Sequence, residues 1–360
     1  MFKLTRWGLF LRPFLRTLKN QFLQKQAISV YWRQDFDRLG LSSSFSRIVL
    51  ESAPQNLAIQ DPLNSEIVHA HSFSSRAIAF LRDARVSPTN GAAFLNGHLV
   101  VEACQGVGAP SRRFSKSWFA PGSRIDRLVL GIPRKSWNFY HWLIEGLPAV
   151  IRARSLKKDL VVLLDRRPPS FVTDSLDMLQ VEYVSRRGMQ MVSELALAVG
   201  GSAGAWPHPD DMELIRKHFV DSAVDRATTS SSPRRIHVSR RFSTRALDNE
   251  VELEERLSDR GFSTVYAERM SLRQQIELFQ RAEIIVGNHG AGLTNILFCP
   301  STARVVEVAS RHNPNYCFEN LASVIGQPYH RVFSEPGRLF DRHFLSPKGM
   351  DEVLESVGGE

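Results

Sequence analysis

From about residue 126, short apolar segments alternate with amphipathic segments, and this alternation constrains the fold more than any other feature of the chain. The apolar segments, such as 160–164 and 283–286, have the length of buried strands, whereas the segments between them have helical spacing. This rhythm is typical of a parallel sheet covered by helices. Breaks rich in Gly, Ser and Pro at 200–209 and 228–233 separate two successive units. The sequence therefore predicts an α/β fold with two doubly wound, Rossmann-like domains facing a cleft.

The expected domain organisation follows from these breaks. With 360 residues, the chain has the length of about two domains. The expected parts are a basic N-terminal helix, a first α/β domain, a linker with a helix, and a second α/β domain, over residues 1–30, 31–205, 206–232 and 233–360. Between residues 31 and 125 the sequence predicts only short strands and one hairpin, with Asn96 and Gly97 at its turn.

Residues 1–22 carry apolar side chains at helical spacing, among them Leu4, Trp7 and Leu11, with basic residues on the other faces. No acidic residue precedes Asp35. A basic amphipathic helix with aromatic residues can lie at the surface of an anionic membrane. The same pattern fits a helix that packs on the domain with its basic face in water, and both alternatives stay open.

Charge and cysteine content narrow the partners. The formal net charge of +9 favours anionic partners such as nucleotide phosphates or anionic lipid. Nucleic acid is not expected, because the sequence has no zinc-finger or RNA-recognition pattern. Cys104, Cys299 and Cys317 are far apart, which fits a reducing compartment rather than a disulfide framework. We therefore expect a cytoplasmic location, with peripheral contact at the inner face of the membrane as the variant that residues 1–22 allow.

The strongest local motif is the glycine-rich segment from Gly287 to Asn295, which follows an apolar strand and precedes a short helix. In open α/β sheets, ligands bind at the carboxyl ends of strands, and a helix N-terminus attracts phosphate. Gly290 and Gly292 let the backbone approach a ligand closely, and His289 could bind phosphate or act as an acid or base. The alternative is a tight turn with a buried histidine, and the motif favours the ligand site.

A second motif places Asn138, His141 and Glu145 at positions i, i+3 and i+7 of an expected helix, so that they share one face. His141 or Glu145 could take a proton from a hydroxyl group. A solvent-exposed polar face is the alternative, but the neighbouring Trp137 and Trp142 make it less favourable.

Arginines form the third motif. Ser239 and Arg240 end an expected strand, and Arg245 follows closely. Arginines at the end of a strand suit bidentate contacts with a diphosphate, although surface arginines alone would be the simpler interpretation.

Three other patterns point elsewhere. Ser202 lies in a Gly-x-Ser-x-Gly pattern, but prolines follow at once, so a link between domains is favoured over a hydrolase nucleophile. Asp35 and Asp37 match the short Asp-x-Asp pattern of some metal-nucleotide sites, with no clear strand before them. His208, Asp210 and Asp211 could bind a metal, but an Asp cap at a helix start is simpler. A non-catalytic nucleotide- or sugar-binding module and a basic membrane scaffold remain as alternatives to an enzyme.

Taken together, the motifs of residues 125–330 resemble glycosyltransferase family 61. The segment from Asn138 to Pro148, the strand ending in Ser239 and Arg240, and the segment from Gly287 to Asn295 carry this resemblance. Asn288 departs from the family pattern, in which a small residue or proline usually precedes the histidine. Residues 1–124 show no such resemblance.

The resemblance implies a GT-B architecture, a nucleotide-sugar donor held mainly by the second domain, and inversion at the anomeric carbon. Arg240, Arg245 and the Gly290–Gly292 loop would hold the diphosphate in place of a metal, and Glu307 would bind the donor ribose or base. The implied donor-binding set is Ser239, Arg240, Arg245, His289, Gly290, Ala291, Gly292, Asn295 and Glu307.

On the acceptor side, the resemblance implies that His141 or Glu145 acts as the base, with His289 as a third candidate and Asn138 nearby. No cofactor and no metal are expected. The expected acceptor is a glycan or lipid-linked glycan in the biosynthesis of a capsule, exopolysaccharide or lipopolysaccharide.

Overall fold

The computed structural model describes residues 45–52, 55–60, 67–73, 75–88, 91–100, 124–129, 138–164, 167–186, 188–221, 233–311, 315–338 and 342–358. The expected helix within residues 1–30 and the Asp35–Asp37 pattern lie outside these ranges. Within them, no helix combines the length and the apolar character needed to cross a bilayer.

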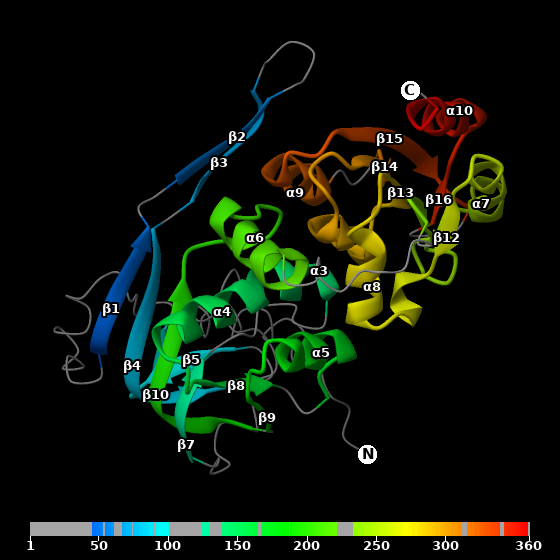
Figure 1. The fold of residues 1–360 in the computed structure, drawn as a ribbon. Helices are drawn as coiled ribbons and strands as arrows, with labels where there is room; N and C mark the ends of the chain where they lie inside the picture. Colours follow the sequence, from blue (N-terminus) through cyan, green and yellow to red (C-terminus); the bar gives the residue numbers. More distant parts are fainter. Residues whose placement is uncertain are drawn as a thin grey trace, which may run out of the picture.

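The first unit is built on a mixed sheet with the strand order β6-β5-β4-β10-β7-β8-β9, and β1 also pairs with β4 (Figure 1). Strands β10, β7, β8 and β9 are parallel neighbours, whereas β4 is antiparallel to β1, β5 and β10. A separate antiparallel hairpin, β2–β3, projects beyond this sheet. The strand bounds are β1 Phe45–Ser52, β2 Gln55–Gln60, β3 Ile67–Phe73, β4 Arg76–Val86, β5 Ala93–Leu95, β6 His98–Val100, β7 Arg124–Val129, β8 Val161–Leu164, β9 Tyr183–Ser185 and β10 Gln190–Val199.

This first unit corrects the expectation of two doubly wound domains, because antiparallel strands make up about half of its sheet. Among the described residues, helices pack on one face of the sheet, and the apolar cluster of the other face is formed by strand residues. Those helices are α3 Phe139–His141, the π-helical turn η3 Trp142–Gly146, α4 Leu147–Leu156, α5 Ser170–Met178, α6 Pro209–Arg216 and the second π-helical turn η4 Lys217–Asp221.

Strand β4 is not predicted from the sequence, because it is buried on both faces. Its first six residues are all buried, since both of its faces are covered, and no alternation of apolar and polar residues results. The hairpin β5–β6, in contrast, is confirmed. Asn96 and Gly97 both have positive φ angles, 45° and 89°, as a tight two-residue hairpin turn requires.

The second unit is a sheet with the order β12-β11-β13-β14-β15-β16, in which the first five strands are parallel and β16 is antiparallel. Counted within the unit, the parallel strands have the order 2-1-3-4-5 of a doubly wound fold. The bounds are β11 Arg235–Val238, β12 Ser263–Val265, β13 Ile284–Asn288, β14 Arg304–Ser310, β15 Tyr329–Pro336 and β16 His343–Phe344.

Helices cover both faces of this second sheet, which confirms the doubly wound prediction here. On one face lie α8 (Leu272–Phe279), η7 (Ala291–Phe298) and α9 (Cys317–Ile325), and on the other lie α7 (Glu250–Ser258) and α10 (Pro347–Ser356). A short 3-10 turn, η6 (Ala267–Arg269), follows β12. Because the strand order reverses between β11 and β13, the carboxyl ends of these two strands form the switch point at which such folds bind ligands.

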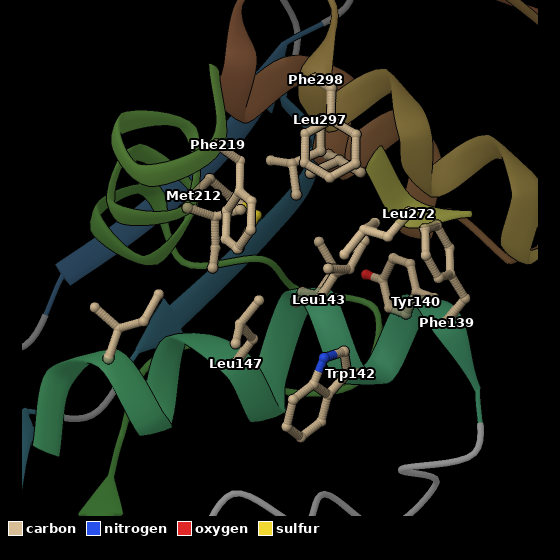
Figure 2. Packing of buried hydrophobic residues seen from close by; sticks show 14 of the residues in the cluster. Phe139, Tyr140, Trp142, Leu143, Leu147, Met212, Phe219, Leu272, Leu297 and Phe298 are labelled. Carbon is tan, nitrogen blue, oxygen red and sulfur yellow. The ribbon is translucent and has the colours of Figure 1, made fainter. Parts of the chain in front are cut away.

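One apolar cluster joins the helices of the first unit to α8, η7 and α9 of the second. Figure 2 shows Phe219 facing Phe298, and their ring centroids are 6.4 Å apart. Tyr140 and Leu272, both labelled in this view, belong to the same cluster. Buried apolar surface therefore connects the helix after β7 directly to the helices of the second sheet.

The helix that carries His141 contains a π-helical turn from Trp142 to Gly146. Here the N–H of Leu147 bonds to the carbonyl of Trp142, five residues back. Pro148 follows directly, and a proline has no N–H and clashes with the carbonyl four residues before it. The π-helical turn just before the proline accommodates this disturbance of the helix.

Candidate functional site

Arg240 lies at the carboxyl end of β11 and reaches across the switch point to the glycine-rich loop. Its guanidinium donates to the backbone carbonyl of His289, and its own N–H donates to Glu250 Oε1 at 3.1 Å. A Cβ atom on Gly290 would overlap this guanidinium. Gly290 is therefore the position where the missing side chain admits Arg240.

Arg245 adds a second positive charge beside Arg240. Burial, and after it the charge of Arg245, lower the pKa of Arg240 to about 10, against the opposing effect of Glu250 and Glu268. Arg245 is exposed, and its guanidinium makes no hydrogen bond or ion pair with the side chains that the structure describes. Two neighbouring arginines with unused donors suit an anion with several oxygens.

His289 forms a dyad with Glu307. The two side chains are 2.6 Å apart, from Nδ1 to Oε1, so Nδ1 donates and Nε2 is left for a ligand. Glu307 is fully buried, and its other oxygen accepts from the Tyr329 hydroxyl and from Arg331. Burial, together with Glu307, raises the pKa of Tyr329, which keeps that hydroxyl a donor.

This geometry corrects the expected role of Glu307. A carboxylate that is fully buried and engaged at both oxygens is not open to a ribose or base. Glu307 is instead a positioning residue, which orients the His289 ring.

A second dyad lies on the helix of the first unit. His141 Nδ1 is 2.9 Å from Glu145 Oε1, and the same oxygen accepts from the N–H of Gly204 at 2.8 Å. Glu145 is buried and His141 is partly exposed. The Nδ1 proton of His141 is thus held by Glu145, and Nε2 is the basic nitrogen.

Asn138 has a structural role at the start of this helix. Its Oδ1 accepts from the N–H groups of Tyr140 at 2.9 Å and His141 at 3.4 Å, as an N-cap does. The cap fixes the backbone at His141, so Asn138 positions the dyad.

A row of rings connects the two dyads across the two units. The ring centroids are 5.1 Å apart for His289 and Phe318, 5.6 Å for Phe318 and Tyr140, and 5.4 Å for Tyr140 and His141. The structure therefore brings His141, Glu145 and His289 into one region, although about 150 residues separate the two motifs along the chain.

Two expected donor contacts, Ser239 and Asn295, are used within the protein. Ser239 is buried and donates to Glu254 at 2.7 Å, while Asn295 is buried and donates to Gln275 at 2.7 Å and to the carbonyl of Gly292 at 2.9 Å. Both side chains stabilise the loops at the switch point. Ala291 and Gly292 are partly exposed at the start of η7.

The structure contradicts a nucleophile at Ser202. Gly200 and Gly201 have positive φ angles of 68° and 90°, so the segment is a loop rather than a strand-to-helix elbow. Ser202 Oγ donates to Asp211 at 3.1 Å and accepts from the N–H of His208 at 2.8 Å. Its partners are a carboxylate and a backbone amide, and no imidazole is among them.

Near residue 208, the sequence suggests an Asp cap or a metal site, and the structure shows a different cap and two ion pairs. His208 itself is the N-cap of α6, because its Nδ1 accepts from the N–H of Asp210 at 3.2 Å. Asp210 and Asp211 pair with Arg76. In the described ranges, no group of three or more His, Cys, Asp or Glu side chains is arranged for a metal ion.

Sequence reasoning missed several residues that complete the site. Glu250 is buried, and its carboxylate accepts from the N–H groups of Arg240 and Leu247 and from the side chain of Asn288 at 2.5 Å. Asn288, the departure from the family pattern, thus ties the glycine-rich loop to the arginine loop. Tyr329 and Arg331 lie on β15, beyond the last predicted element, and only the alternation of their strand could have indicated them.

Comparison with known proteins identifies the segment that holds this geometry. Residues 139–306 match the family model described as Glycosyltransferase 61. This segment is similar to glycosyltransferase family 61. The matched segment includes His141, Glu145, Arg240 and His289, and ends one residue before Glu307.

Two curated relatives are named as transferases of a sugar. The EGF domain-specific O-linked N-acetylglucosamine transferase of Drosophila melanogaster is 34% identical over 96 residues, which are 26% of this chain and 18% of that protein. The beta-1,2-xylosyltransferase of Arabidopsis thaliana is 29% identical over 94 residues, which are 25% of this chain and 16% of that protein. The chain thus matches less than a fifth of the length of either relative.

Proposed function

We propose that this glycosyltransferase moves a sugar from a nucleotide-sugar donor to a hydroxyl acceptor, with inversion at the anomeric carbon. The observation that carries the proposal is the switch point, where Arg240 lies across Gly290 with Arg245 beside it. Such a site suits a diphosphate, the anionic part of a nucleotide-sugar.

In this proposal the two units act as the halves of a GT-B enzyme. The second unit holds the donor, and the first unit presents the acceptor side with His141 and Glu145. The doubly wound topology of the second unit and the row of rings between the dyads support this arrangement.

His141 is the base in the proposed reaction. The acceptor hydroxyl gives its proton to His141 Nε2 while its oxygen attacks the anomeric carbon from the face opposite the diphosphate. The bond from the anomeric carbon to the diphosphate oxygen breaks, and the nucleoside diphosphate leaves with the electron pair. Glu145, hydrogen-bonded to Nδ1, stabilises the imidazolium that forms.

His289 and the arginines stabilise the charge of the leaving group. Arg240 and Arg245 stabilise the negative charge that grows on the diphosphate, and His289 Nε2 contacts it from the glycine-rich loop. Turnover needs no divalent metal in this scheme, since fixed positive side chains supply the same stabilisation. Glu307 holds the His289 ring in the orientation that this contact requires.

The biological setting belongs to the same proposal. The acceptor is a glycan or lipid-linked glycan in polysaccharide biosynthesis, in the cytoplasm or at the inner face of the membrane through residues 1–22. Vesicles with anionic lipid test the membrane contact, because deletion of residues 1–22 should abolish sedimentation with them.

The direct test is a screen for transfer. The protein is incubated with nucleotide-sugars of UDP, GDP and CMP and with oligosaccharide acceptors, with and without EDTA, and release of the nucleotide is measured. Acceptor-dependent release that persists in EDTA is the expected result. Binding of a nucleotide without release for any acceptor would instead identify a non-catalytic binding module.

A further inference from the structure

Phe242 is 57% exposed, more than any other large hydrophobic side chain in the described ranges. It lies in the loop between β11 and α7, between Arg240 and Arg245 in the sequence. An apolar ring in water gives up the free energy that burial would provide. A ring held open among arginines that suit a diphosphate is therefore a candidate contact for the rest of that ligand.

The Phe242 ring contacts three side chains. The guanidinium of Arg269 lies over it at 4.2 Å from the centroid and that of Arg241 at 6.0 Å, and the centroid of the Tyr266 ring lies at 5.1 Å with an interplanar angle of 55°. Tyr266 follows β12, and Arg269 is in the η6 turn. Cation–π contacts of this kind fix the orientation of an aromatic ring.

The support is anchored to the sheet through Glu254 of α7. Its Oε1 accepts from the Tyr266 hydroxyl at 3.3 Å and from Ser239 at 2.7 Å, and its Oε2 pairs with Arg241 at 3.4 Å. The orientation of the Phe242 ring is therefore held by a preorganised cluster of side chains.

This cluster lies beside the diphosphate site. Phe242 and Tyr266 follow the carboxyl ends of β11 and β12, which are adjacent parallel strands. Glu268, in the same turn as Arg269, is close enough to Arg240 to affect its pKa. The surface thus offers an aromatic ring that is more than half exposed, next to two arginines, and this combination complements a ligand with a planar ring and a diphosphate.

We propose that Phe242 is the stacking platform for the nucleobase of the donor, with Arg240 and Arg245 on the diphosphate of the same molecule. This inference rests on the proposed function and assigns the part of the donor that the arginines leave free. Stacking is tolerant of base identity, because every base has a π-face. The nucleotide class is then chosen by other contacts.

The test separates the base from the diphosphate. Calorimetry measures the affinities of the wild type, Phe242→Ala and Phe242→Trp for UDP, GDP and inorganic diphosphate. We expect Phe242→Ala to weaken the preferred nucleoside diphosphate about 5- to 150-fold, the range for loss of one stacked base, with unchanged affinity for inorganic diphosphate. Phe242→Trp should retain nucleoside diphosphate binding.

Phe333→Ala is the matched control. Phe333 of β15 is also exposed, at 36%, and the guanidinium of Arg311 lies 5.2 Å from its ring centroid. Its strand is separated from β11 by β13 and β14, so this ring is remote from Arg240. Unchanged nucleoside diphosphate affinity in Phe242→Ala would overturn the platform and leave the diphosphate site intact. Equal loss for nucleoside diphosphate and inorganic diphosphate would also overturn it. Absence of binding to all three probes in the wild type would overturn the proposed function and this inference together.

Discussion

At the scale of single residues, Gly290 has no side chain, and Arg240 occupies the space where one would lie. The backbone of Gly290 is extended, with φ of 171°, so an alanine would fit the backbone without strain. The glycine is thus required by the arginine and not by the turn. This distinction makes Gly290 a probe of the proposed anion site that leaves the fold intact.

Gly290→Ala should therefore weaken nucleotide binding without loss of stability. A displaced Arg240 loses charge-assisted contacts of about 1.5–3 kcal/mol, which corresponds to about 10- to 150-fold in affinity. Calorimetry of UDP or GDP binding and a thermal melt of the same protein check both parts. Wild-type affinity in Gly290→Ala would show that Arg240 does not hold the ligand.

His141 allows a separate kinetic prediction. His141→Ala should lower kcat by about 10²- to 10⁴-fold, the usual contribution of a general base, while nucleotide affinity stays unchanged. Glu145→Gln should lower kcat less and shift its pH profile, because Glu145 acts through His141. His330→Ala is the control, since His330 pairs with Glu352 on the surface and should retain full activity. Full activity in His141→Ala would remove it as the base.

At the scale of elements, the sequence predicts the segments whose side chains carry their own pattern. Strands β11 and β13 are short apolar runs that end in polar or glycine-rich loops, and their predicted ends lie within two residues of the observed ones. Strand β4 lacks alternation because both of its faces are buried, and β15, β16 and α10 lie beyond the last segment with a clear pattern.

The candidate site likewise contains contacts that the sequence predicts and contacts that it does not. His141 and Glu145 are four residues apart on one helix, so their contact follows from helical geometry. The contact of His289 with Glu307 depends on the pairing of β13 with β14, in which Gly287 is opposite Glu307. The residues that pair between these two strands are 20 positions apart in the sequence, so their pairing is set by packing in three dimensions and spacing along the chain does not reveal it.

Helix α8 offers a test of a helix cap. Ser271 accepts from the N–H of Gln274, and Gln274 accepts in turn from the N–H of Ser271, which completes a capping box. Ser271→Ala should destabilise the protein by about 1 kcal/mol in urea unfolding. Ser301→Ala, at an exposed turn, should change stability by less than about 0.5 kcal/mol. Equal stability of the two variants would show that the cap contributes nothing.

At the scale of the whole molecule, one apolar cluster spans both units and several ionisable groups lie buried close to it. Burial lowers the pKa of His237 to about 3 and lowers that of His208 as well. Glu250 Oε1 lies 3.8 Å from His237 Nε2, and burial raises the pKa of the Glu250 carboxyl. The stability of the fold therefore depends on pH through these groups.

Acidification should destabilise the protein through His237. The folded chain keeps His237 neutral down to a pKa of about 3, whereas the unfolded chain protonates it near 6.5, so the unfolded state binds more protons between these values. The free energy of unfolding should fall with pH below 6.5, by up to about 1.4 kcal/mol per pH unit, with a partial offset from Glu250. Urea unfolding between pH 7 and pH 4 should show a smaller slope for His237→Gln. Equal slopes would contradict the assignment.

The central claim is that the arginines at the switch point between β11 and β13 hold a nucleoside diphosphate. Calorimetric titration of UDP, GDP and CMP into the wild type, Arg240→Ala and Arg234→Ala tests it most directly. Arg234 is the control, because it precedes β11 at the opposite end of that strand and pairs with Glu283 on the surface. We expect saturable binding of UDP or GDP to the wild type and to Arg234→Ala, at least a tenfold weaker affinity for Arg240→Ala, and weaker binding of CMP, which has only one phosphate. Equal affinities for Arg240→Ala and the wild type, or no binding to any of the three proteins, would contradict the account.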